Sequence, residues 1–214
     1  MPSPLGHALV AFAAGWTAGP AECRALPSPR AGSEPGILRT LSRWRWPIAF
    51  AAAGMAPDLD LIVGLHSRWT HSVGAAILVL AATWLLLRGR HPRPATAALA
   101  LGLSYGSHVL LDWLATDRVP PIGIMALWPF SNGFYLSPVT VFMGISREYW
   151  LATAWTQNAV SVAWELLIVL PLSGAALLVR RPGVPNLQRE AAGTRQKPKH
   201  RATTPQERRK SIVR

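Results

Sequence analysis

The sequence has few charged residues and almost no cysteine. Only 15% of its 214 residues are charged and half are apolar, whereas soluble domains usually carry about 25% charged residues. Cys23 is the single cysteine, which excludes an internal disulfide and any zinc site built from thiolates. A metal ion held by this chain must therefore be bound by histidine and carboxylate side chains.

Several motifs that mark common functions are also missing. We find no internal repeat, no glycine-rich phosphate loop, no Gly-x-Ser-x-Gly motif and no DNA-binding signature. The formal charge is +12, but residues 181–214 alone contribute +8 from ten basic and two acidic residues. This tail is poor in apolar residues, so we expect it to be disordered and to contact anionic lipid headgroups. We expect no specific nucleic-acid partner.

Five apolar runs dominate the rest of the chain. They cover residues 5–19, 46–65, 72–87, 95–115 and 161–179, and three of them approach the roughly 20 residues that cross a bilayer. The first run lacks a basic start, so we interpret it as retained and not as a signal peptide. The pattern predicts an all-α, polytopic membrane bundle over residues 1–180 with about five apolar helices, followed by the tail. The alternative is a soluble or monotopic α-bundle in which these helices are buried.

Basic residues indicate the orientation of this bundle. The segment between the first two runs holds five arginines, and the link between the third and fourth runs holds Arg88, Arg90 and Arg93. If each run crosses once, these segments and the tail lie on one side, which the positive-inside rule assigns to the cytoplasm. We therefore expect an inner or plasma membrane protein whose amino terminus, 66–71 turn and 116–160 segment face outward.

The connection over residues 116–158 is rich in proline and aromatic residues. Proline interrupts helices, and tryptophan and tyrosine favour the membrane–water interface. The segment is therefore either a lid or binding loop or an interfacial belt without a substrate role. Glu165 is expected at the start of the last helix, as a packing residue.

The strongest functional signal is a set of ionisable residues beside the apolar runs. Such residues are costly near hydrocarbon and usually mark a function. His108 and Asp112 are spaced i, i+4 on one helical face, so both could reach one metal ion, or Asp112 could orient the imidazole. Pro57 predicts a break that lets Asp58 and Asp60 both turn inward. On the five-crossing topology the candidate ligands gather at the outer face: His7, Asp58, Asp60, His66, His71, His108 and Asp112.

A donor set of histidines and carboxylates suits a divalent metal, with zinc first and manganese or iron as alternatives, in a one-ion or two-ion centre. Many phosphoesterases use a two-metal centre, so the expected chemistry is hydrolysis of phosphoester bonds. The position of the ligands at the membrane face favours lipid-like substrates over soluble nucleotides. Asp58 or Asp60 would accept a proton from the attacking water, and Arg68 would offset phosphate charge. The alternative is a non-catalytic scaffold, carrier or stress-response factor with a structural metal or ion-pair site.

Four motifs in order resemble the YdjM-like family of LexA-regulated, membrane-bound metal-dependent hydrolases. They are the early His7, Pro57-Asp58-Leu59-Asp60, the His66–Ser72 turn, and Ser107–Asp112 followed by Gly123 and Leu127-Trp128-Pro129-Phe130. The family has a more distant resemblance to zinc phospholipase C and P1-type nucleases. This resemblance implies ligand roles for His7, Asp58, His66, His71, His108 and Asp112, with Asp60 a ligand or a supporting group. One departure is Ser67-Arg68, where the family commonly has Arg-Gly.

Overall fold

The computed structural model describes residues 1–24, 36–64 and 67–179, and within these residues it contains helices but no strand. The all-α prediction is therefore confirmed for this part of the chain. The predicted disordered tail and His66 lie outside the described residues. The elements are α1 (Pro4–Ala18), α2 (Ala21–Arg24), α3 (Gly36–Met55), the 3₁₀ helix η1 (Ala56–Val63), α4 (Val73–Leu87), α5 (Pro94–Trp113) and α6 (Ala152–Val179).

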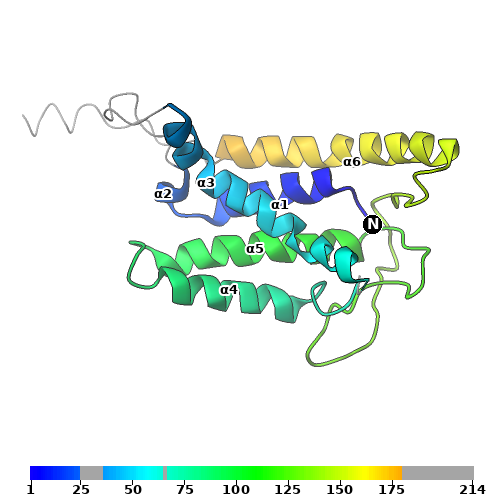
Figure 1. The fold of residues 1–214 in the computed structure, drawn as a ribbon, viewed down its shortest axis with the longest axis horizontal. Coiled ribbons are helices and arrows are strands. Elements are labelled where there is room, and N and C mark those ends of the chain that lie inside the picture. The colour runs from blue at the N-terminus through cyan, green and yellow to red at the C-terminus, as the bar shows by residue number, and fades with distance from the viewer. Residues whose placement is uncertain (25–35, 65–66, 180–214) are drawn as a thin grey trace, which may run out of the picture. The chain divides into compact units, whose positions relative to one another are not determined.

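Helices α1 and α5 form the centre of the bundle (Figure 1). Helix α1 contacts α3, α5 and α6, while α5 contacts α1, α3 and α4. Two buried apolar clusters hold this arrangement, one around Phe50 and Ala97 and the other around Leu111 and Val169. The outer helices α4 and α6 each pack mainly on one inner helix, so most of their apolar surface stays exposed.

Local sequence sets where the helices begin. Ser3 caps α1 by accepting a hydrogen bond from the backbone N–H of Gly6 at 3.2 Å, and Pro4 occupies the first helical turn. Ser72 caps α4 in the same way through the N–H of Ala75 at 3.0 Å. These caps fix the start of α1 just before His7 and the start of α4 just after His71.

The second apolar run is not one helix. Helix α3 already starts at Gly36 and ends at Met55, and the chain then continues as η1. This break agrees with the effect expected of Pro57, because proline lacks the N–H that a continuing α-helix needs. Gly64 ends η1 in a left-handed conformation with φ of 69°, a conformation that glycine adopts without steric cost.

The last helix begins earlier than predicted. Helix α6 starts at Ala152, so the connection ends near residue 151 and not at residue 158, and Glu165 lies inside the helix and not at its start. At 1.5 Å per residue its 28 residues are roughly 42 Å long, against about 30 Å for a bilayer core. The helix is therefore longer than the apolar run from which it was predicted, and its first turns carry polar residues.

One described helix, α6, is long and apolar enough to cross a membrane by itself, and α4 is a shorter apolar helix of 15 residues. The expectation of about five crossings is thus supported for one helix only. The exposed faces of α4 and α5 are nevertheless apolar: Ile77, Leu78, Leu86 and Leu110 are each more than half exposed.

The long connection between α5 and α6 is ordered by backbone hydrogen bonds. The N–H groups of Val73 and Gly74, at the start of α4, donate to the carbonyls of Ala126 and Trp128 at 2.9 and 3.1 Å. Ile124 and Tyr135 also pair across the connection. These bonds satisfy helix donors that have no partner within α4, and they hold the connection at the end of the bundle where α4 begins.

Candidate metal centre

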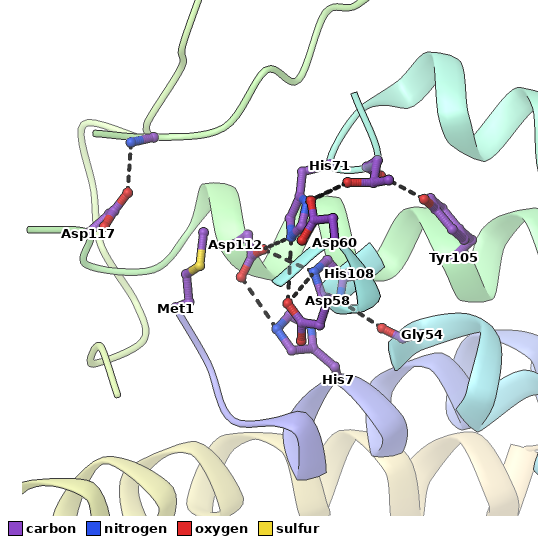
Figure 2. Close-up of polar contacts among 12 residues, drawn as sticks. Met1, His7, Gly54, Asp58, Asp60, His71, Tyr105, His108, Asp112 and Asp117 are labelled. Carbon is purple, nitrogen blue, oxygen red and sulfur yellow. Dashed lines mark hydrogen bonds and ion pairs between the residues drawn. The ribbon is translucent and has the colours of Figure 1, made fainter. Parts of the chain in front are cut away.

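Side chains from four segments meet at one end of the bundle (Figure 2). His7 lies in the second turn of α1, Asp58 in η1, His71 just before α4, and His108 and Asp112 near the end of α5. Helices α1 and α4 start at this end, whereas α3 and α5 finish there (Figure 1). The alternating chain direction thus brings together residues that are up to 105 positions apart.

His108 and Asp112 form the base of the cluster. Nε2 of His108 lies 3.1 Å from Oδ2 of Asp112, which is one helical turn further along α5. Nδ1 of His108 lies 2.7 Å from the carbonyl oxygen of Gly54, which can only accept a hydrogen bond. Nδ1 therefore carries a proton, which leaves Nε2 as the nitrogen of His108 that could bind a metal ion at the centre.

A second supported histidine faces His108. Nδ1 of His71 lies 3.2 Å from Oδ2 of Asp60, and the Thr70 hydroxyl donates to the same oxygen at 2.5 Å. Tyr105 in turn donates to the Thr70 carbonyl at 2.7 Å. With Nδ1 bonded to Asp60, Nε2 of His71 faces Oδ2 of Asp112 at 3.4 Å and Oδ1 of Asp58 at 3.6 Å. A carboxylate behind a histidine is the usual support of a metal-bound imidazole.

His7 and Asp58 complete the donor set. Nε2 of His7 lies 3.3 Å from Oδ1 of Asp112, and the His7 ring stacks on the ring of His108 with centroids 3.8 Å apart. Oδ1 of Asp58 lies 3.6 Å from Nε2 of His108. Two groups of donor atoms each lie within 4.8 Å of one another, namely His7 with His108 and Asp112, and Asp58 with His71 and His108.

The cluster needs positive charge. Asp58, Asp60 and Asp112 are three carboxylates, and an oxygen of each lies 3.2–3.6 Å from a histidine ring nitrogen. Burial lowers the pKa of His71, but its hydrogen bonds to Asp58 and Asp60 outweigh burial and raise this pKa to about 9. Without a metal ion, a proton on His71 therefore supplies part of this charge.

The spacing of the donors fits a metal ion. With bonds of about 2.0–2.1 Å, neighbouring ligands of a tetrahedral zinc ion lie roughly 3.3–3.4 Å apart. The contacts between donor atoms in the cluster run from 3.1 to 3.6 Å. Nε2 of His108 and both carboxylate oxygens of Asp112 are buried and make no hydrogen bond within the described residues. Buried polar atoms rarely stay in that state, so the cluster could hold a metal ion.

The cluster reaches the surface at one of its five donor residues. The side chains of His7, His71, His108 and Asp112 are at most 1% exposed, whereas the Asp58 side chain is 23% exposed. Next to it, η1 carries apolar side chains on the surface, with Leu59 64% and Ile62 82% exposed. The partly exposed Asp58 carboxylate is therefore a polar entrance to the cluster beside an apolar surface.

The remaining predicted residues lie elsewhere or have other partners. Asp60 belongs to neither metal-capable group found among the described residues. Its Oδ2 accepts from Thr70 and lies 3.2 Å from Nδ1 of His71. Of the two alternatives for Asp60, its contacts favour the supporting role over the ligand role. The Arg68 side chain is exposed, and its role towards a substrate phosphate stays a prediction. Glu165 is buried but bonds to Ser3, away from the donor atoms.

Three supporting groups were missed by the sequence reasoning. Tyr105 lies three residues before His108, on the same face of α5, and this spacing alone could have indicated it. Thr70 lies inside the histidine turn directly before His71. The Gly54 carbonyl is a backbone group, so no residue pattern could have revealed it.

The described residues define an all-helical fold with a buried histidine–aspartate centre that could hold a metal ion. A family model described as YdjM inner membrane protein matches residues 1–183, and the chain belongs to this family. No curated protein and no solved structure matches the chain. The more distant similarity to zinc phospholipase C and P1-type nucleases is therefore not shown.

Proposed function

We propose that this protein is a membrane-bound, metal-dependent hydrolase that acts on phosphoester bonds of lipid-like substrates. The observation that carries the proposal is the buried His7–Asp58–His71–His108–Asp112 cluster, which reaches the surface at Asp58 beside an apolar η1. A lipid headgroup reaches such an entrance while its chains stay in contact with apolar surface.

A divalent ion, most suitably zinc, would be held by the Nε2 atoms of the three histidines and by Asp58 and Asp112. When bound, such an ion polarises a phosphoryl oxygen and lowers the pKa of a coordinated water to about 7. The two donor groups share His108, whose Nδ1 is bonded to the Gly54 carbonyl and whose Nε2 can bind only one ion, so a second ion would need a donor in place of His108. Asp58 is the accessible carboxylate, so it can also accept a proton from an attacking water at the entrance.

Chain direction supports the proposed membrane arrangement of five crossings, with the basic tail in the cytoplasm and the site facing outward. The site lies at one end of the bundle, and the arginine-rich link between α4 and α5 lies at the other (Figure 1). Helices α1 and α4 have only 15 residues each, roughly 22 Å. They would therefore need a locally thinned bilayer or flanking residues to complete a crossing.

The test is a metal analysis of detergent-purified protein together with a hydrolysis screen on phospholipids and phosphomonoesters. We expect close to one or two zinc equivalents per chain, and loss of both metal and hydrolysis in His71→Ala and His108→Ala. His91→Ala, in the link between α4 and α5, is the matched control and should retain both. Absence of a stoichiometric transition metal from the wild-type protein would refute the proposal.

A structural metal site is the second candidate, and the nearly complete burial of four donor residues favours it. Structural sites are fully ligated by protein, whereas catalytic sites keep a position for water. Cobalt substitution separates the two. A spectrum that changes on adding inorganic phosphate indicates an open position and supports hydrolysis, and an unchanged spectrum with no activity supports the structural role.

A further inference from the structure

Glu165 is a buried carboxylate in the middle of α6 that the metal centre does not use directly. Its side chain is 3% exposed, and α6 is the helix with the clearest membrane-spanning character. An acidic residue in such a helix is costly and is normally kept for a specific interaction. Its contacts therefore indicate what it does.

Those contacts are with the first turn of α1. The backbone N–H of Ser3 donates to the Glu165 carboxylate, with distances of 3.0 and 3.2 Å to its two oxygens. The carboxylate lies at the amino-terminal end of α1, where unpaired N–H groups and the helix dipole favour negative charge. Gly6 makes this approach possible, because a Cβ atom at that position would overlap the Glu165 carboxylate.

The same turn leads directly to His7. The carbonyl of Ser3 accepts the backbone N–H of His7 at 3.1 Å. Nε2 of His7 then faces Oδ1 of Asp112 at 3.3 Å. Two hydrogen bonds thus connect the Glu165 carboxylate through Ser3 to the backbone of His7, whose side chain supplies Nε2 to the cluster. His7 is the fourth residue of α1, and helix ends fray unless they are tied down.

We propose that Glu165 is a positioning residue for the metal centre: it fixes the first turn of α1 and thereby sets the position of His7 against Asp112. The proposal rests on the proposed function only in so far as the cluster binds metal. It does not depend on hydrolysis.

The test measures Co²⁺ affinity and the visible Co²⁺ spectrum of full-length protein in detergent. Glu165→Ala should weaken Co²⁺ binding by about tenfold or more, as loss of supporting contacts does at other metal sites, and should alter the spectrum. Glu165→Gln keeps a carbonyl oxygen that can accept from Ser3, so it should restore most of the affinity. Val169→Ala, one turn further along α6 in the buried cluster, is the control for packing of α6 on α1. It should leave the affinity within about twofold.

A double-mutant cycle makes the test specific for His7. In a His7→Ala background, removing Glu165 should change Co²⁺ affinity no further, because the donor that it positions is already gone. Equal affinity of Glu165→Ala and wild type overturns the proposal, as does an equal loss in Val169→Ala or a full additional loss in the His7→Ala background. Wild-type protein that binds metal but hydrolyses nothing refutes the hydrolase and leaves this role of Glu165 intact. Wild-type protein that binds no metal overturns both.

Discussion

At the level of single residues, the centre separates donors from the groups that hold them. His71 and His108 each use Nδ1 for a fixed acceptor, Asp60 in one case and the Gly54 carbonyl in the other. In each ring Nε2 faces the cluster, so the direction of this nitrogen is set before an ion binds. Pre-set donors bind with less loss of conformational entropy.

The two aspartates of the Pro57–Asp60 motif should therefore differ on substitution. We expect Asp58→Asn to remove a ligand and to lower zinc affinity more than Asp60→Asn. Asp60→Asn keeps a side-chain oxygen that can accept a hydrogen bond from His71, so it should lower zinc affinity by about 10- to 100-fold. Competition with a chromophoric chelator measures both affinities. An Asp60→Asn variant that binds zinc more weakly than Asp58→Asn would show that Asp60 is itself a ligand.

Thr70 allows a second test of whether Asp60 holds His71 in place. Thr70→Val keeps the shape of the side chain but loses the 2.5 Å hydrogen bond to Asp60, so zinc affinity should fall severalfold. Thr70→Ser keeps the hydroxyl and should bind zinc as the wild type does. The same chelator competition measures both variants, and identical affinities for them would contradict the role of Thr70.

At the level of elements, the close contact of α1 with α3 sets the distance between His7 and the supports of His108. A Cβ atom at Gly54 would overlap the side chain of Ala11 and lie 2.8 Å from the carbonyl oxygen of His7. The same glycine supplies the carbonyl that holds His108. One position thus controls both helix packing and the geometry of the centre.

We expect Gly54→Ala to destabilise the protein by about 1–3 kcal/mol, because overpacking forces the two helices apart. Gly174→Ala is the matched control, since nothing lies within 4 Å of that position in α6. It should be neutral or stabilising by up to about 1 kcal/mol. Thermal unfolding of both variants in detergent distinguishes them, and equal melting temperatures would argue against the close contact.

Sequence patterns predicted the elements unequally well. The apolar runs placed α1, α4 and α5 almost to the residue, because caps and prolines coincide with the ends of these runs. The start of α6 was predicted nine residues too late, since its first turns are polar and carry no apolar signal. The alternating direction of successive helices was enough to predict that five donor residues gather at one end of the bundle: His7, Asp58, His71, His108 and Asp112. The support of His71 by Asp60 and Thr70 depends on side-chain geometry that no spacing rule contains.

At the level of the whole molecule, a metal ion would add a further link between four segments that helix packing and hydrogen bonds already hold together. A ligand that binds the folded state alone stabilises it by RT ln(1 + [L]/Kd), about 2.7 kcal/mol at a ligand concentration of 100 Kd. We therefore expect chelation to lower the melting temperature and added zinc to restore it. In His108→Ala, the melting temperature should not respond to zinc, and a response equal to that of the wild type would place the ion elsewhere.

The proposed orientation has its own test. Cys23 is buried and is the single cysteine, so a Cys23→Ser background permits single-cysteine labelling. A membrane-impermeant maleimide added to intact spheroplasts should label Ser131→Cys in the long connection but not Arg90→Cys in the link between α4 and α5. Permeabilisation should make Arg90→Cys reactive. The opposite labelling pattern would show that the site faces the cytoplasm.

The order of the donors along the chain has a consequence for biogenesis. His7 leaves the ribosome early, and His108 and Asp112 follow about a hundred residues later. The complete donor set therefore exists only once α5 has been synthesised and has packed against α1. We expect chains arrested before α5 to bind no ion, so that metal loading is a late step that reports a correctly assembled bundle.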